Sequence, residues 1–238
     1  MSHISTKTVR KEFENAISTA LRIYGPVRHD CVWNYESINE STFHPRVAFK
    51  VVGLAFLSIV AAWEEYIENS FLRYMAGAKS KSSYSPKLRI GKCKSTTHAI
   101  QVLTGVVNSN DATRFLRWND YDWVSARASI FFQKGEPYSR ISTGFQQRLK
   151  DAQIIRNRVA HSSSKARHQF RRMTNLNIGE PANSPMDYGF SPGKYLVHNN
   201  PEIIFDKSWV DSKDCEWPDI FECYVHMFTE IIDIITPN

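Results

Sequence analysis

The sequence predicts an all-α fold, a helical bundle with long irregular loop insertions. Apolar residues recur at helical spacing in residues 6–24, 46–76, 144–161 and 217–236. Stretches rich in Ser, Gly and Pro separate these segments, as expected of loops. With 238 residues and 42% hydrophobic composition, the chain can bury a sizeable core. We therefore expect a single domain over residues 1–238, with insertions at about residues 79–142 and 177–216.

The first two segments predict the helical core. Residues 6–24 form an amphipathic pattern, and Gly25 followed by Pro26 is expected to end that helix. Residues 46–76 are the most apolar segment, and their uncharged run, residues 51–63, has 13 residues. A bilayer-spanning helix needs about 20 apolar residues. We therefore expect the central helix of a soluble bundle and no membrane association.

The next 60 residues combine basic and aromatic side chains. Residues 79–94 form a basic loop whose Ser, Gly and Pro content argues against packed structure, and Lys79 and Lys81 are candidate contacts to an RNA backbone. A solvated connection is the alternative for this loop. Two or three short helices follow within residues 96–132. There, Trp118 and Trp123 lie among arginines and either stack on bases or, as we favour, belong to the core.

The helix predicted for residues 144–161 contains the candidate functional residues. Arg156 falls inside the apolar stripe of that helix, so its guanidinium needs a carboxylate, a polar groove or a second subunit. Glu64 or Glu65, at the end of the long apolar helix, is a candidate partner, although this acidic cluster can equally be a solvated helix end. Asn157 and His161 lie four residues apart and therefore close together.

The remaining segments complete the predicted bundle. A basic helical run contains Lys165 and Arg167 and continues through Arg172. Residues 177–200 are expected to be irregular, residues 201–205 to form a short strand or extended piece, and residues 217–236 to close the bundle. We find no internal repeat, no phosphate-binding glycine loop and no paired-carboxylate nuclease motif in the sequence.

Charge and cysteine content suggest the partners and the compartment. The net charge is +6, and residues 79–172 hold 19 Lys and Arg against 5 Asp and Glu, so this part carries +14 and the remainder −8. This segregation favours a polyanionic partner. The four cysteines have no disulfide-framework spacing, and the N-terminus has no apolar signal region, so we expect a cytoplasmic protein. Cys223 with His226 is a weak metal candidate, because two further ligands are missing nearby.

Residues 156–161, Arg-Asn-Arg-Val-Ala-His, resemble the R-x4-6-H motif, in its R-N-x-x-x-H form, of the HEPN superfamily (higher eukaryotes and prokaryotes nucleotide-binding domains). The resemblance implies a dimerising α-helical bundle whose two motifs meet to form a metal-independent endoribonuclease site without a cofactor. By that resemblance Arg156, Asn157 and His161 are catalytic. Some toxin members carry a Tyr two residues after the His, where this chain has Ser163.

The resemblance further suggests a toxin or antiviral effector that acts on RNA as a homodimer, with an antitoxin or regulatory partner. Arg158, Lys165, Arg167, Lys79 and Lys81 are the candidate RNA-binding residues. Two other hypotheses stay open. The same residues could hold RNA, a nucleotide phosphate or an antitoxin without catalysis. Alternatively, Arg156 and His161 could be fold elements of a structural or interaction protein, in which case their substitution would lower stability alone.

Overall fold

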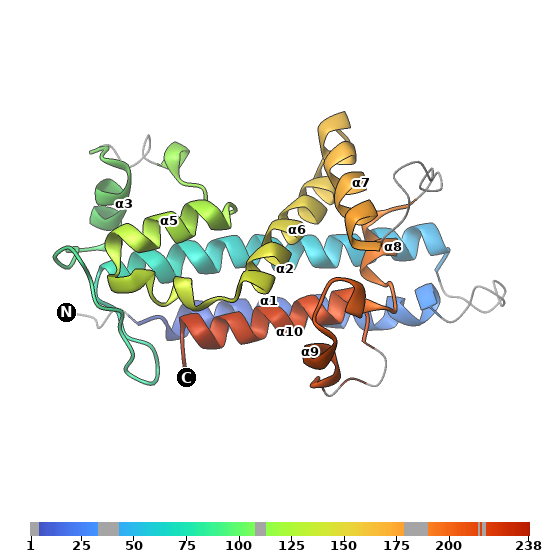
Figure 1. Cartoon of the computed structure of the whole chain (residues 1–238), viewed down its shortest axis with the longest axis horizontal. Coiled ribbons are helices and arrows are strands. Elements are labelled where there is room, and N and C mark those ends of the chain that lie inside the picture. The colour runs from blue at the N-terminus through green and yellow to red at the C-terminus, as the bar shows by residue number, and fades with distance from the viewer. Residues whose placement is uncertain (1–4, 33–42, 108–112, 179–189, 214, 216–217) are drawn as a thin grey trace. The chain divides into compact units, whose positions relative to one another are not determined.

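The computed structural model of the chain describes residues 5–32, 43–107, 113–178, 190–213, 215 and 218–238 (Figure 1). These residues form helices and loops, and none of them lies in a β-strand. The α-helices are α1 (Lys7–Val32), α2 (Pro45–Met75), α3 (Thr96–Thr104), α5 (Tyr121–Phe131), α6 (Thr143–Ala160), α7 (Ser164–Ile178), α8 (Pro192–Leu196), α9 (Lys207–Asp211) and α10 (Ile220–Ile235). Short 3-10 helices are η1 (Thr113–Phe115), η2 (Gln133–Gly135), η3 (Tyr138–Arg140) and η4 (Pro201–Ile203). The predicted all-α bundle is confirmed.

Helix α1 is longer than predicted. The expected end at Gly25 and Pro26 is wrong, because the helix continues to Val32. A proline within a helix removes one backbone hydrogen bond and costs about 3 kcal/mol. Beyond it, however, Val27 and Cys31 are buried, and Arg28 forms an ion pair with Glu222 of α10. These tertiary contacts explain why the helix continues through the proline.

Helix α2 has the bounds that the apolar pattern predicts, within one residue at each end. Among the described helices it is the one that is long and apolar enough to cross a bilayer, with 44% of its most apolar window buried. The core helix of a soluble protein meets the same length and composition criterion. The expectation that the protein does not associate with a membrane therefore stays a prediction.

The chain divides into two compact units. Unit 1 comprises Met1–Asn15, Ala62–Gln146 and Thr229–Asn238, and unit 2 comprises Ala16–Ala61 and Gln147–Phe228. Helices α1, α2, α6 and α10 each contribute residues to both units. The boundary falls inside continuous helices rather than in linkers, and the organisation as one domain stays a prediction.

Unit 1 is built around aromatic side chains of α2. The ring of Phe71 lies 5.5 Å from that of Trp118, 4.9 Å from that of Phe132 and 5.1 Å from that of Tyr138, measured between centroids. Trp118 is 8% exposed, so the core interpretation is correct for this residue. Trp123 is only partly buried and lies beneath the guanidinium of Arg127.

The basic loop of unit 1, residues 79–94, makes backbone contacts with the rest of that unit. Its backbone forms a bridge between Leu88 and Phe132, and the amide of Cys93 donates to the carbonyl of Met75 at 2.9 Å. Ser80 is also buried, at 7% exposure. The segment is the irregular, mostly exposed loop that its composition predicts, and these backbone hydrogen bonds hold it at several points.

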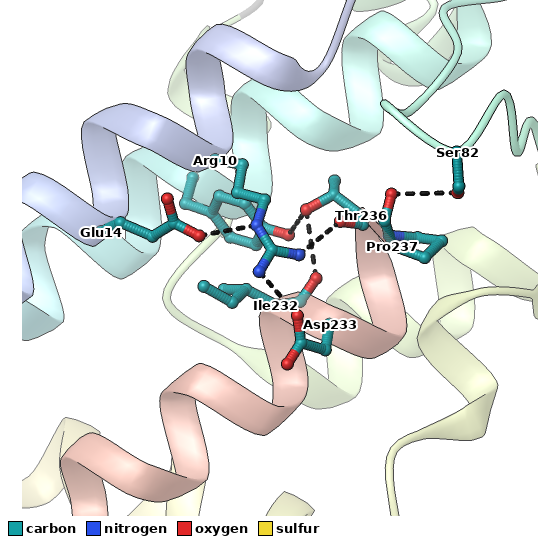
Figure 2. Close-up of polar contacts among 8 residues, drawn as sticks. Arg10, Glu14, Ser82, Ile232, Asp233, Thr236 and Pro237 are labelled. Atoms are coloured by element: carbon teal, nitrogen blue, oxygen red, sulfur yellow. Dashed lines mark hydrogen bonds and ion pairs between the residues drawn. The ribbon is translucent and has the colours of Figure 1, made fainter.

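The C-terminal end of the chain is fixed in unit 1 by Arg10 of α1 (Figure 2). Its Nη1 donates to the carbonyl of Thr236 at 2.8 Å, its Nη2 pairs with Asp233 at 2.6 Å, and its Nε pairs with Glu14 at 2.7 Å. Burial alone would lower the pKa of Arg10, but Asp233 and Glu14 outweigh it and the pKa is raised. The buried guanidinium therefore stays charged and ties α1 to α10.

Unit 2 joins the later part of α1 to the beginning of α10. The rings of Tyr24 and Phe221 stack with centroids 4.1 Å apart, and Phe56 of α2 lies 6.1 Å from Phe221. Helix α8 approaches α2 closely, since a β-carbon on Gly193 would lie 1.8 Å from the carbonyl oxygen of Phe49. Only glycine fits this contact between backbones.

Residues 177–205 contain more helix than the sequence predicts. Within the predicted irregular stretch, residues 179–189 lie outside the described residues, and the rest includes the end of α7 and all of α8. The extended piece predicted for residues 201–205 is wrong, because η4 occupies its first three residues. Pro201 presets the backbone for a tight helical turn as readily as for an extended one.

Candidate functional site

The candidate site lies at the C-terminal end of α6. Ser142 caps the start of this helix. Its hydroxyl oxygen accepts a hydrogen bond from the amide of Phe145 at 3.3 Å, and its carbonyl oxygen accepts one from the amide of Gln146 at 2.9 Å. Leu149, Ala152 and Ile155 are buried at three-residue intervals. This buried face fixes the rotation of α6 and hence the direction of the motif side chains.

The last turn of α6 packs against α2 within unit 2. A β-carbon on Gly53 would lie 3.4 Å from Cγ2 of Val159, which is ordinary van der Waals contact. A small side chain would therefore also fit at position 53, and the distance places the last turn of α6 beside α2. Because Val159 lies between Arg156 and His161, the contact holds the backbone of the motif against the bundle.

Arg156 and Asn157 are half-buried neighbours on this turn. The Oδ1 atom of Asn157 accepts from Nη1 of Arg156 at 3.4 Å and from Nε2 of Gln153 at 3.4 Å. Both hydrogen bonds are long and therefore weak. Because the side-chain oxygen accepts both bonds, the amide nitrogen of Asn157 is the atom that could donate to an anion.

His161 follows the last residue of α6 and is exposed. Its amide donates to the carbonyl of Asn157 at 2.9 Å, and its carbonyl accepts from Nη1 of Arg158 at 3.4 Å. Ser163 then caps α7, accepting the amide of Ala166 on its hydroxyl at 3.2 Å. The backbone of His161 is therefore held between two helices, while its imidazole is accessible to solvent.

The candidate glutamates belong to the other unit. Glu64 is half-buried and Glu65 is exposed, and both lie in unit 1, whereas Arg156 lies in unit 2. Their pairing with Arg156 stays a prediction. Burial raises the pKa of the Glu68 carboxyl, one turn further along α2, above its usual value.

The candidate RNA-binding cations fall into two groups. Arg158, half-buried on α6, and the exposed Lys165 and Arg167 on α7 belong to unit 2, as does the motif. Lys79 and Lys81 are exposed in the ordered loop of unit 1. The structure thus brings the first group together with Arg156 and His161 in one compact unit.

A buried polar cluster beneath the motif was not predicted. Asp151 of α6 is 2% exposed, pairs with Nη2 of Arg148 at 3.1 Å and accepts from Nε2 of Gln147 at 3.2 Å. Burial raises the pKa of Asp151, although Arg148 opposes the shift. Close by, Nδ2 of Asn177 on α7 donates to the hydroxyl of Tyr195 on α8 at 2.9 Å. The cluster connects α6, α7 and α8.

One signal in the sequence could have revealed this cluster. Asp151 is the single acidic residue within residues 137–179 and lies four positions before the buried Ile155, on the same side of the helix. A lone carboxylate on an apolar face requires buried partners. Arg148, one turn earlier, is the partner that the sequence supplies locally.

The weak metal candidate at Cys223 has no support. Cys223 is fully buried, and burial raises the pKa of its thiol to about 12, so the thiolate that binds metals is disfavoured. Among the described residues, no group of three or more His, Cys, Asp or Glu side chains could hold a metal ion.

The arrangement at the end of α6 combines groups that serve phosphate chemistry. Arg156 can neutralise a phosphate, the amide of Asn157 can orient it, and the exposed imidazole of His161 can exchange a proton. No protein-family model, no curated protein and no solved structure matches the chain.

Proposed function

We propose that the protein is a metal-independent endoribonuclease with Arg156, Asn157 and His161 as its catalytic residues. The observation that carries the proposal is that the half-buried Arg156 and Asn157 are hydrogen-bonded to each other near the end of α6, which the exposed His161 follows directly. The resemblance of this hexapeptide to the HEPN motif supports the same assignment. Each side chain has a role that the reaction requires.

The chemistry is an attack of the ribose 2′-oxygen on the adjacent phosphorus. His161 removes the 2′-hydroxyl proton, or delivers a proton to the departing 5′-oxygen. Arg156 stabilises the additional negative charge on the phosphoryl oxygens, and Asn157 orients the phosphate. The new bond joins the 2′-oxygen to phosphorus as the bond from phosphorus to the 5′-oxygen breaks. The products carry a 2′,3′-cyclic phosphate and a 5′-hydroxyl.

A homodimer completes this site. An exposed histidine acts in bulk water, where hydrogen bonds and charges stabilise a transition state weakly. A second copy placed over the end of α6 would exclude water and bring a second Arg156 and His161 to the phosphate. Such a dimer fits a toxin or an antiviral effector, which an antitoxin or regulatory partner would control.

The test compares cleavage of total cellular RNA by the wild-type protein and by His161→Ala in EDTA, with the product ends identified. We expect wild type to leave cyclic phosphate ends, and the variant to be slower by about 10²–10⁴-fold, the usual contribution of a general acid or base. His44→Ala is the matched control, because His44 is also exposed in unit 2. Cleavage that is equal in all three proteins would contradict the proposal.

RNA binding without cleavage is the second candidate function. The observation that favours it is that Lys165 and Arg167 are exposed in the same unit as the motif. Because Lys and Arg supply most of the affinity for phosphates, a binding protein should lose little affinity on His161→Ala. If wild type binds RNA, remains folded and leaves no cyclic phosphate ends, this function replaces the first.

A further inference from the structure

Helix α7 has two chemically distinct sides. One side is buried and consists of Ala166, Phe170, Met173 and Thr174. The opposite side is exposed and carries Lys165, Arg167, Arg171 and Arg172. The helix contains no Asp or Glu, and the whole stretch of residues 152–178 has six Lys and Arg and no acidic residue.

Within the described part of the chain, the four exposed cations of α7 form no ion pair. Arg167 and Arg171 lie four positions apart, where like charges destabilise a helix by a few tenths of a kcal/mol. A surface that keeps such repulsion is suited to an anionic partner, which would remove the repulsion on binding.

Packing holds this basic side outward. Phe170 contacts the ring of Tyr195 on α8, with centroids 6.0 Å apart, and its ring lies 6.4 Å from that of Phe190. The hydrogen bond from Asn177 to Tyr195 fixes the far end of α7. Since α7 is anchored at its middle and its end, the direction of its cations is set before any ligand binds.

The composition of the exposed side favours a nucleic acid over a bilayer. A helix that lies in a membrane interface carries Trp, Phe or Leu in a continuous apolar face open to lipid. In α7 the apolar side is buried in unit 2, and Leu176 is its single large hydrophobic residue with high exposure, at 76%. The exposed side of α7 is therefore mainly polar and basic, as expected of a surface that follows a phosphate backbone.

We infer that the exposed side of α7 binds the single-stranded RNA that flanks the scissile phosphate. The inference rests on the proposed function. Lys165 lies four residues after His161, and the cations extend over seven further positions, a length of about 10 Å. That length suits a short strand rather than one phosphate. The strand is single because attack by the 2′-oxygen requires a backbone free to turn into line, which a stacked duplex restricts.

The test measures how the affinity for a non-cleavable strand depends on salt. The probe is a fluorescent single-stranded oligonucleotide of mixed sequence with every 2′-hydroxyl methylated, so cleavage cannot interfere. For single strands, the logarithm of the binding constant falls with the logarithm of salt concentration by about 0.7 for each phosphate neutralised. We expect the double variant Arg171→Gln, Arg172→Gln to have a slope shallower by about 1.4.

The matched control is Arg46→Gln, Lys50→Gln, which removes two exposed cations four positions apart on α2 of the same unit. Its slope should equal that of wild type. Thermal melting followed by circular dichroism establishes that both double variants are folded. If the α7 variant retains the wild-type slope, or if wild type does not bind the strand, the inference is wrong.

The two proposals fail in different ways. If wild type does not cleave RNA but the α7 variant has a shallower salt dependence of binding, the ribonuclease proposal is wrong and α7 is still an RNA-binding surface. If wild type produces cyclic phosphate ends but the α7 variant has the wild-type slope, the ribonuclease proposal stands and the proposed role of α7 is wrong. A slope change of equal size in the α2 control would also overturn it, because binding would then depend on net charge.

Discussion

At the scale of single residues, Arg10 makes the most specific prediction about stability. Replacing it with Ala removes its ion pairs with Glu14 and Asp233 and its bond to the Thr236 carbonyl. The two carboxylates are 44% and 57% exposed and can be solvated, so the cost comes mainly from the buried hydrogen bond and lost packing. We expect the free energy of unfolding to fall by about 2 kcal/mol in urea titrations.

The exposed Lys11, next to Arg10 in sequence, supplies the control. Lys11→Ala should change the free energy of unfolding by less than about 0.5 kcal/mol. If Arg10→Ala is as mild as Lys11→Ala, the tie between α1 and the end of α10 contributes nothing to stability.

Asp219 makes stability depend on pH. Burial raises the pKa of its carboxyl from 3.8 to about 6, although a hydrogen bond from Tyr24 lowers it. The folded chain thus binds this proton more tightly than the unfolded chain, so its stabilisation is complete below about pH 4 and is lost as pH rises through about 6. Relative to wild type, Asp219→Asn should become more stable between pH 4 and 7, by at most about 3 kcal/mol.

Urea unfolding at a series of pH values measures this difference. The exposed Asp211, substituted with Asn, is the comparison, and its curve should run parallel to that of wild type. Parallel curves for Asp219→Asn and wild type would show that burial does not perturb Asp219 as the structure indicates.

Single residues also show where sequence analysis works. The place of Arg156 in an apolar stripe predicted that it would not face bulk water, and it is half-buried. Helical periodicity contains that information. The local part of the polar cluster, Asp151 with Arg148, left a signal in the sequence, but its other members, Asn177 and Tyr195, lie on later helices. Partners brought together by tertiary packing leave no local pattern in the sequence.

At the scale of elements, two glycines on helices give opposite predictions. Gly25 lies inside α1, and a β-carbon added there would have no atom within 4 Å, so Gly25→Ala should stabilise the helix by up to about 1 kcal/mol. Gly193 touches the backbone of α2, so Gly193→Ala should destabilise unit 2 by more than that. Thermal melting should rank the proteins as Gly25→Ala above wild type above Gly193→Ala. The reverse order would contradict the packing of α1 and α8.

Helix ends were predicted less well than helix positions. Residues 46–76 and 144–161 match α2 and α6 within one residue, because strong apolar periodicity defines them. The end of α1 was misplaced because Gly25 and Pro26 are local signals, whereas Val27 and Cys31 are stabilised by burial that occurs only in the folded chain. The backbone contacts of the loop at residues 79–94 were not predicted for the same reason, since they join residues far apart in sequence, such as Leu88 and Phe132.

At the scale of the whole molecule, the proposed site makes the dimer a condition for activity. Each chain supplies one Arg156 and one His161, and the exposure of His161 leaves room for a second copy at the end of α6. If the phosphate takes Arg156 from one chain and His161 from the other, neither Arg156→Ala nor His161→Ala can cleave alone. Mixed dimers of the two variants would regain one complete set of catalytic groups.

We therefore expect mixing inactive Arg156→Ala with inactive His161→Ala, after subunit exchange, to restore a measurable part of wild-type cleavage. Sedimentation equilibrium should give twice the chain mass of 27.5 kDa for wild type and for both variants. Each variant alone, taken through the same exchange procedure, is the control and should stay inactive. If wild type is active and sediments at 27.5 kDa, the site is complete in one chain and the composite arrangement is wrong. If the protein is dimeric and the mixture stays inactive, each chain must use its own Arg156 and His161, and dimerisation then serves water exclusion rather than the exchange of catalytic groups.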